Sequence, residues 1–248
     1  MRLLIISVCL ALGWGVAVAE PITLSGAIGS RPVFFEMNRN GDTVSGWYFY
    51  LRAGKQIRLD GKLDHRGFFD IQEYDAASNS RTGSLAGRVK DGHWAGQWKS
   101  ANGQAPRPLS LDPLKDNLKT ADGHYHCTAR RRDEGFGTAM SHSLDLTLAK
   151  GRVTGLSLSR SVRSNGEAPQ RCALAGRDLK QISAHVGLAL RARREGGHCT
   201  LTILGAGDYL VLHPGEAGED CRAGLCTKDA FWTPLVLNRK TGRCVSVE

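Results

Sequence analysis

Residues 43–63 read TVSGWYFYLRAGKQIRLDGKL, two short runs of mixed apolar and polar side chains on either side of Ala53-Gly54-Lys55. Alternation of apolar and polar residues is typical of β-strands, because successive side chains of a strand point to opposite faces of the sheet. A short glycine-containing turn between two such runs favours an antiparallel hairpin. The stretch therefore predicts strands at Thr43–Leu51 and Gln56–Leu63.

Runs of the same kind continue on both sides of this hairpin, with glycine, asparagine and aspartate at the turns between them. They are Ile22–Ile28, Arg31–Asn38, Phe68–Tyr74, Thr82–Val89, His93–Lys99 and Arg107–Leu111. Short strands at a spacing of about 8–12 residues predict an antiparallel sandwich or barrel. Most runs also contain an interior glycine, such as Gly46, Gly61, Gly87 or Gly96, and glycine inside a strand permits a bend or a close approach of backbones. We therefore expect a small, strongly curved sheet.

The second half of the chain is also dominated by period-two apolarity. The runs are Ser143–Ala149, Arg152–Ser159, Cys199–Leu204, Tyr209–His213 and Pro234–Asn238. One helix is expected at Asp178–Ala184, where Leu179 and Ile182 lie one turn apart and Asp178 is placed to cap the first turn. The predicted fold class is mostly β, with two small antiparallel barrel or sandwich domains, at most one short helix, and disulfides in the second domain.

The cysteines divide the chain into two parts. One of the seven, Cys9, lies in the N-terminal apolar segment, and the other six all follow residue 126: Cys127, Cys172, Cys199, Cys221, Cys226 and Cys244. An even number of cysteines in an exported chain predicts disulfides, but the fifteen ways of pairing six cysteines stay open. The uneven distribution predicts an N-terminal domain over residues 20–113, a linker over 114–121 and a disulfide-containing domain over 122–248.

The N-terminus predicts export. Arg2 is followed by an almost wholly apolar run, Leu3–Val18, and by the small-x-small site Ala17-Val18-Ala19. This is the three-part pattern of a signal peptide, with cleavage expected after Ala19 and a periplasmic or secreted product. The run is too short for a typical membrane anchor, and no later segment is long and apolar enough to span a membrane.

The chain has a formal net charge of +9, of which Arg2 belongs to the signal peptide. Positive charge favours anionic partners such as lipid headgroups, acidic polymers or an acidic protein. Export argues against nucleic acid as the partner.

Three groups of polar residues have the side-chain types of reactive sites. His124, His126 and His142 have the donor types of a zinc or copper site, but Cys127 adjoins them and is expected in a disulfide, so no metal or cofactor is predicted. Ser141-His142-Ser143 with Asp145 has the residue types of a hydrolase triad without a nucleophile-elbow glycine pattern. Paired carboxylates for glycoside cleavage are available among Asp60, Asp64, Asp70 and Glu73. The sequence therefore assigns no catalytic residues, and an enzymatic function is the less favoured interpretation.

Two other groups indicate binding. Trp47, Tyr48 and Tyr50 lie with Phe49 in one predicted strand, where alternation sends one aromatic pair to the core and offers the other as a contact surface. The alternative is that both faces of this strand are covered. Arg130, Arg131 and Arg132 form a dense basic run. These six residues are the predicted partner-binding set.

The stretch from Gly123 to Cys244 resembles a domain of exported bacterial proteins related to lysozyme inhibitors. The matching residues are Gly123-x-Tyr125, Cys172-Ala-Leu-Ala-Gly176, Cys199-Thr-Leu-Thr-Ile203 and Asp220-Cys-Arg-Ala-Gly-Leu-Cys226. This chain departs from the pattern at the last motif, where Leu225 is an extra residue and Thr227 replaces a glycine. Gly26–Leu111 resembles a companion β-domain of envelope proteins.

The resemblance implies a small β-barrel that binds another protein. The lysozyme-contacting Ser-Gly-x-x-Tyr loop of that family is not matched, because Phe49 stands at the tyrosine position after Ser45-Gly46. The cationic chain would also repel lysozymes, which are usually cationic. The expected function is therefore a non-enzymatic periplasmic protein that inhibits, or confers immunity to, an envelope-acting hydrolase or toxin. The alternatives are a module that binds an anionic glycan or lipid surface of the envelope, and a hydrolase that uses the carboxylates or histidines above.

Overall fold

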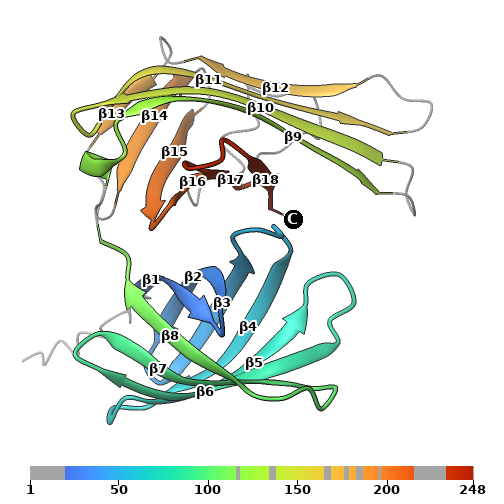
Figure 1. Cartoon of the computed structure of the whole chain (residues 1–248), viewed down its shortest axis with the longest axis vertical. Coiled ribbons are helices and arrows are strands. Elements are labelled where there is room, and N and C mark those ends of the chain that lie inside the picture. The colour runs from blue at the N-terminus through green and yellow to red at the C-terminus, as the bar shows by residue number, and fades with distance from the viewer. Residues whose placement is uncertain are drawn as a thin grey trace, which may run out of the picture.

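The first half of the chain forms a closed eight-stranded antiparallel barrel in a computed structural model of the protein (Figure 1). The structure describes residues 20–115, 118–133, 138–164, 169–175, 179–182, 187–194, 197–214 and 233–247. The barrel strands are β1 (Glu20–Ile28), β2 (Arg31–Asn40), β3 (Thr43–Tyr50), β4 (Gln56–Leu63), β5 (Phe68–Asp75), β6 (Arg81–Lys90), β7 (His93–Ser100) and β8 (Arg107–Pro113). Each strand pairs with the next along the chain, and β8 closes the barrel against β1.

Apolar side chains fill the barrel, and glycines allow its wall to curve. Leucines, aromatics and Met37 point inward, among them Phe35, Tyr48, Trp94 and Trp98. The interior glycines of the strands lie where neighbouring backbones approach closely: a Cβ on Gly46 would stand 2.2 Å from the carbonyl oxygen of Glu36. No larger residue fits such a gap, which confirms the expectation of a small, strongly curved sheet.

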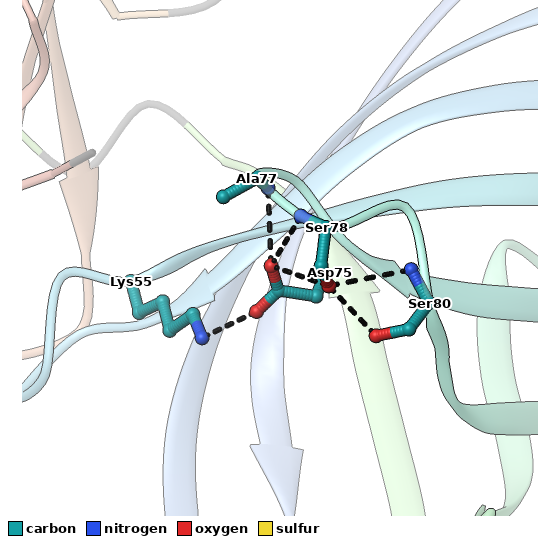
Figure 2. A network of polar contacts seen from close by, with 5 residues as sticks. All are labelled: Lys55, Asp75, Ala77, Ser78 and Ser80. Atoms are coloured by element: carbon teal, nitrogen blue, oxygen red, sulfur yellow. Dashed lines mark hydrogen bonds and ion pairs between the residues drawn. The ribbon is translucent and has the colours of Figure 1, made fainter.

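Polar side chains fix the turn between β5 and β6 (Figure 2). The carboxylate of Asp75 accepts hydrogen bonds from the backbone amides of Ala77 and Ser78, at 3.1 and 3.0 Å, and pairs with the ammonium of Lys55. These interactions, led by the contact with Lys55, hold the pKa of Asp75 well below its usual range. The turn is therefore an ordered part of the barrel rim.

Two antiparallel sheets form the second half. The first holds β9 (Gly123–Asp133), β10 (Thr138–Ala149), β11 (Arg152–Arg163) and β12 (Gln170–Ala175). The second holds β13 (Leu179–Ile182), β14 (Leu188–Arg194), β15 (Gly197–Ala206), β16 (Tyr209–Pro214), β17 (Leu235–Asn238) and β18 (Cys244–Ser246). Leucines from both sheets share one core, so the sheets pack face to face.

A disulfide between Cys127 and Cys244 joins β9 to β18. It links the first strand of one sheet to the last strand of the other, across 117 positions of sequence, and so ties the two ends of this half together. Cys172 is also disulfide-bonded. Cys221, Cys226 and the side chain of Cys199 lie outside the described residues.

The six-stranded sheet is covered on both faces. Its other face packs against the outside of the barrel, where Val211 and Val236 meet Phe34 and Phe49 in a second apolar cluster. In Figure 1 this sheet lies between the four-stranded sheet and the barrel. Double coverage explains the nearly continuous apolar runs of β16 and β17, which differ from the alternation of one-sided strands.

The connection between the halves is packed against both of them. Leu114 joins the apolar cluster at the barrel surface, while Leu118 and Ala121 are buried in the core of the second half. A short 3-10 helix, η1 (Leu118–Thr120), lies within this connection. Arg239 reaches back to the carbonyl oxygen of Thr120, at 3.0 Å.

The predicted strands of the barrel are confirmed to within about two residues at their ends. The helix expected at Asp178–Ala184 is wrong: Leu179–Ile182 is strand β13 and pairs with β14. Two apolar residues three positions apart are compatible with one helical turn. Here the segment instead forms backbone hydrogen bonds with the neighbouring strand β14. None of the described helices is long and apolar enough to span a membrane. The predicted signal peptide, residues 1–19, lies outside the described residues.

Candidate functional site

A carboxylate is buried inside the barrel. Glu73 is 2% exposed and accepts hydrogen bonds at Oε1 from the phenol of Tyr48 and, at 2.7 Å, from the indole Nε1–H of Trp98. Gly83 leaves room for it, because a Cβ there would stand 2.5 Å from Oε2 of Glu73. Burial raises the pKa of Glu73, and burial together with the nearby carboxylate raises the pKa of Tyr48. Because the group is closed off from solvent, it fixes the barrel interior and presents nothing to a ligand outside.

The aromatic strand is covered on both faces. Tyr48 is 1% exposed and stacks on Phe35 inside the barrel, with ring centroids 4.5 Å apart. Trp47 stacks on His213 of the second half, at 5.3 Å, beside the fully buried Phe49. The expectation that one aromatic pair forms a contact surface is therefore corrected for Tyr48, which lies in the core. Trp47 lies at the junction of the two halves.

Tyr50 is half-buried, and the guanidinium of Arg31 lies 5.9 Å from the centre of its ring. Burial raises its pKa. Of the three predicted aromatic contacts, only Tyr50 and Trp47 keep partial access to solvent.

The structure does not bring together the residues that could serve in hydrolysis. Glu73 faces the barrel interior, whereas Asp60 and Asp70 are exposed on the strands around it. Asp64 accepts the backbone amides of Arg66 and Phe68 and so caps a turn. On β10, His142 is 1% exposed and faces the core, so the sheet separates its ring from the side chains of Ser141, Ser143 and Asp145.

The predicted histidine pair lies on the outer face of the four-stranded sheet. Nε2 of His124 lies 3.0 Å from a carboxylate oxygen of Asp145, and Nδ1 of His126 lies 3.6 Å from the other. His142 is on the opposite face of the sheet. Among the residues that the structure describes, no group of three or more histidine, cysteine or acidic side chains is arranged to hold a metal ion.

One large apolar side chain is exposed on the described surface, and two arginines flank it. Phe68 is 49% exposed, and the guanidiniums of Arg88 and Arg66 lie 5.0 and 5.9 Å from the centre of its ring. We call Arg66, Phe68 and Arg88 the aromatic–arginine patch. It unites an apolar ring with two cations, the side-chain types enriched at protein interfaces.

The aromatic–arginine patch is held by rigid backbone. Phe68 and Arg88 are directly opposite on β5 and β6. The turn before Phe68 is closed by Asp64, whose Oδ1 lies 2.8 Å from the amide of Phe68, and these bonds lower the pKa of Asp64. Gly67 packs against β6, where the amide of Val89 donates to its carbonyl oxygen at 2.7 Å. The backbone that carries the ring is therefore already ordered before a partner binds, which lowers the entropic cost of binding.

Sequence reasoning missed this patch although a signal was present. Phe68 and Phe69 are neighbours in one strand, so alternation requires one of the two rings to point outward. Phe69 fills the barrel against Trp94, which leaves Phe68 on the outer face.

A second feature is a hollow of about 460 Å³ on the four-stranded sheet. Its lining is Arg130, Arg131, Ala139, Met140, Ser141, Ser161 and Arg163, and we call it the arginine hollow. The predicted basic residues Arg130 and Arg131 are exposed here, while the side chain of Arg132 lies outside the described residues. Arg163 lies on β11 and lines the same hollow. Its position there follows from the pairing of β10 with β11 and not from the sequence around it.

A third feature is a groove of about 670 Å³ between the barrel rim and the six-stranded sheet. Its floor includes Leu24, Leu63 and Trp94, and its wall includes Glu36 and His213, whose carboxylate oxygen and ring nitrogen are 3.5 Å apart. The acidic and basic groups of the wall largely balance, so the groove has no clear charge preference.

Comparison of the chain with protein-family models, with curated proteins and with solved structures finds no match. The family resemblance of residues 123–244 therefore stays a prediction.

Proposed function

We propose that this protein is a non-enzymatic binding protein that inhibits, or confers immunity to, an envelope-acting hydrolase or toxin, and that the aromatic–arginine patch is its contact surface. The observation that carries the proposal is the exposed ring of Phe68 between two guanidiniums. The argument rests on the combination, because an aromatic ring beside arginines unites the side-chain types that are enriched at protein interfaces.

The chemistry of the patch specifies its partner. Tryptophan, tyrosine and arginine are enriched among the hot spots of protein interfaces, and phenylalanine is enriched at interfaces with them. The guanidinium of Arg88 beside Phe68 favours a carboxylate on the partner, at the edge of an apolar pocket that receives the ring. Arg66 pairs with Asp64, at 3.6 Å, and adds its positive charge beside the ring. The partner face is therefore acidic at its rim and apolar at its centre.

The predicted export signal and the net charge of +9 support the same proposal. An exported protein would reach the compartment where cell-wall hydrolases and secreted toxins act, and its positive charge would favour an acidic partner there. The resemblance to exported proteins related to lysozyme inhibitors supports a protein partner rather than a small substrate.

The test is capture of a partner by the mature protein from envelope and secreted fractions, followed by titration calorimetry and an assay of the partner's hydrolytic or toxic activity. We expect a one-to-one complex in which the partner is inactive. Phe68→Ala with Arg88→Ala is expected to weaken binding about thirty-fold or more, the effect of losing a hot spot.

Lys99→Ala is the matched control, because Lys99 is an exposed cation on another strand of the same barrel. It is expected to bind as tightly as the unaltered protein. Capture of no specific protein, or equal binding by the Phe68→Ala, Arg88→Ala variant, would contradict the proposal.

A further inference from the structure

The arginine hollow is built by the register of three strands. Arg130 of β9, Ser141 of β10 and Ser161 of β11 form one row across the sheet, because Ser141 is directly opposite both of the others. Ala139 is opposite Arg163 in the next row on the same face. Small side chains on the central strand thus form a floor, and long basic side chains rise on both sides.

The dimensions suit a group held from two sides. Adjacent strands lie about 4.8 Å apart and the rows of Arg130 and Arg163 are two residues apart along them, so the two arginines start about 12 Å from each other across the central strand. A guanidinium from each side can then reach one group that rests over Ser141 and Ala139. The hollow of about 460 Å³ leaves room for that group and for the start of a larger molecule.

The two flanking arginines are not committed elsewhere in the described part of the chain. There, Arg130 and Arg163 make no hydrogen bond or ion pair, whereas other surface arginines such as Arg39 and Arg239 are bonded to backbone carbonyls. The strands beneath are anchored to the core by Ala129, Leu144 and Leu158. The donors are therefore carried on a rigid sheet and directed at solvent.

The donor set selects among anions. Guanidiniums approaching from opposite sides, with serine hydroxyls below, offer hydrogen bonds in several directions, which a tetrahedral phosphoryl group accepts through its separate oxygens. A planar carboxylate is satisfied by one guanidinium and leaves the others without a partner. Repeated positive charge also favours a group that carries up to two negative charges.

We propose that the arginine hollow is a binding site for a phosphate monoester, held by Arg130 and Arg163 over Ser141 and Ser161. The phosphate belongs either to a lipid headgroup at the membrane surface or to a soluble molecule. The site goes beyond the proposed inhibitor function, because it lies on another sheet and takes another class of ligand. The proposal of a phosphate site does not depend on whether the aromatic–arginine patch binds a partner.

Two probes test the site in the full mature protein. Inorganic phosphate is titrated while backbone amide shifts of residues in β9, β10 and β11 are followed by NMR. Vesicles of neutral phosphatidylcholine, with and without phosphatidic acid, are tested by co-sedimentation. Shifts with inorganic phosphate assign a soluble source, and binding only to phosphatidic acid vesicles assigns a lipid headgroup.

Arg130→Gln and Arg163→Gln are each expected to weaken binding of the responding probe about ten-fold, because each removes a charge-assisted hydrogen-bonding group. Arg152→Gln is the matched control, since Arg152 is an exposed arginine at the far end of β11, and it is expected to leave affinity unchanged. Equal circular dichroism spectra and melting temperatures show that all three variants are folded.

Two results overturn the proposal. One is the absence of both NMR shifts and selective vesicle binding. The other is an equal loss of affinity in Arg152→Gln and in the hollow variants, which would mean that net charge alone attracts the anion.

Discussion

Tyr48 donates a hydrogen bond from its phenol to the carboxylate of Glu73 in the centre of the barrel, where the two side chains are 1% and 2% exposed. Trp98 donates to the same oxygen at 2.7 Å. Three strands, β3, β5 and β7, are thus joined through one acid inside an otherwise apolar core. This arrangement couples the stability of the barrel to pH.

Glu73 is expected to make the protein less stable as pH rises. Burial raises its pKa in the folded state above the ordinary value of 4.5, so between these two pKa values the folded protein binds a proton that the unfolded chain has released. The contribution of Glu73 to stability is therefore largest below pH 4.5 and is lost as the pH rises through that window. Glu73→Gln, which retains an oxygen acceptor, is expected to flatten this fall in urea unfolding measured from about pH 4 to about pH 8. Glu73→Leu leaves two donors unsatisfied and is expected to cost about 2–4 kcal/mol. An unchanged pH profile in Glu73→Gln would exclude this role.

His142 is expected to act in the opposite direction. Burial, and then the charge of Arg160 across the strand pair, lower its pKa from 6.5 to about 4. The unfolded chain therefore binds a proton that the folded chain rejects, and stability is lost as pH falls from 6.5 toward 4. Both ring nitrogens are buried and have no hydrogen-bond partner among the residues that the structure describes. His142→Leu is therefore expected to be neutral or stabilising at about pH 7 and to lessen the loss of stability in acid. The check is the same urea series, and the idea fails if the variant loses stability in acid as steeply as the unaltered protein.

The interior glycines are expected to resist substitution. A Cβ on Gly61 would stand 2.3 Å from the carbonyl oxygen of Asp70 on the adjacent strand, and one on Gly46 would lie equally close to β2. Gly61→Ala is therefore expected to cost about 3 kcal/mol, because backbone must move. Gly103→Asn is the control: nothing lies within 4 Å of a Cβ there, and asparagine tolerates the positive φ of 74°. Equal unfolding midpoints for the two variants would contradict the close approach of strands.

Two phenylalanines of the barrel are expected to differ in their effect on stability. Phe49 is fully buried between the barrel and the six-stranded sheet, whereas Phe68 is 49% exposed. Phe49→Ala is expected to cost about 3–5 kcal/mol and to lower the unfolding midpoint of both halves, because they share this cluster. Phe68→Ala is expected to change stability by about 0.5 kcal/mol or less. Calorimetry measures both, and a barrel that unfolds unchanged in Phe49→Ala would show that the halves are independent.

The disulfide between Cys127 and Cys244 is expected to stabilise the second half. Replacing both residues by alanine is expected to cost about 2–5 kcal/mol, because the unfolded chain regains the freedom of a loop that spans 117 positions. Guanidinium unfolding provides the measurement. Thr128→Ala serves as control, since Thr128 is an exposed neighbour on the same strand. A double variant as stable as this control would show that the bridge adds nothing.

Much of the barrel could be predicted from the sequence, because its strands and turns are specified by residues that are close together along the chain. Each strand carries its own alternation, and each turn its own glycine, asparagine or aspartate. The predicted Gln56–Leu63 therefore coincides with β4, and the predicted Phe68–Tyr74 ends one residue before β5 does. The candidate sites could be predicted only in part. Arg130 and Arg131 are adjacent in sequence, but Arg163 reaches the same hollow only through the pairing of β10 with β11.

The errors have a common physical origin in partners distant along the chain. Leu179 and Ile182 suit a helix until β14 is available to pair with them. Either aromatic pair of β3 could form a contact surface until the barrel interior takes Tyr48 and the six-stranded sheet covers Trp47 and Phe49. Phe68 looks like one more core residue until Phe69 is found to occupy the interior.

By itself, the sequence determined that this protein is made of short antiparallel strands, because backbone sterics and side-chain alternation act over a few residues. It also determined that any disulfides belong to the second half, because all the cysteines after Cys9 lie there. The tertiary structure alone decided that Cys127 pairs with Cys244, that Glu73 is sealed beneath Tyr48 and Trp98, and that Phe68 remains in solvent. These outcomes depend on which distant surfaces meet, since burial is a property of the packed chain rather than of any segment.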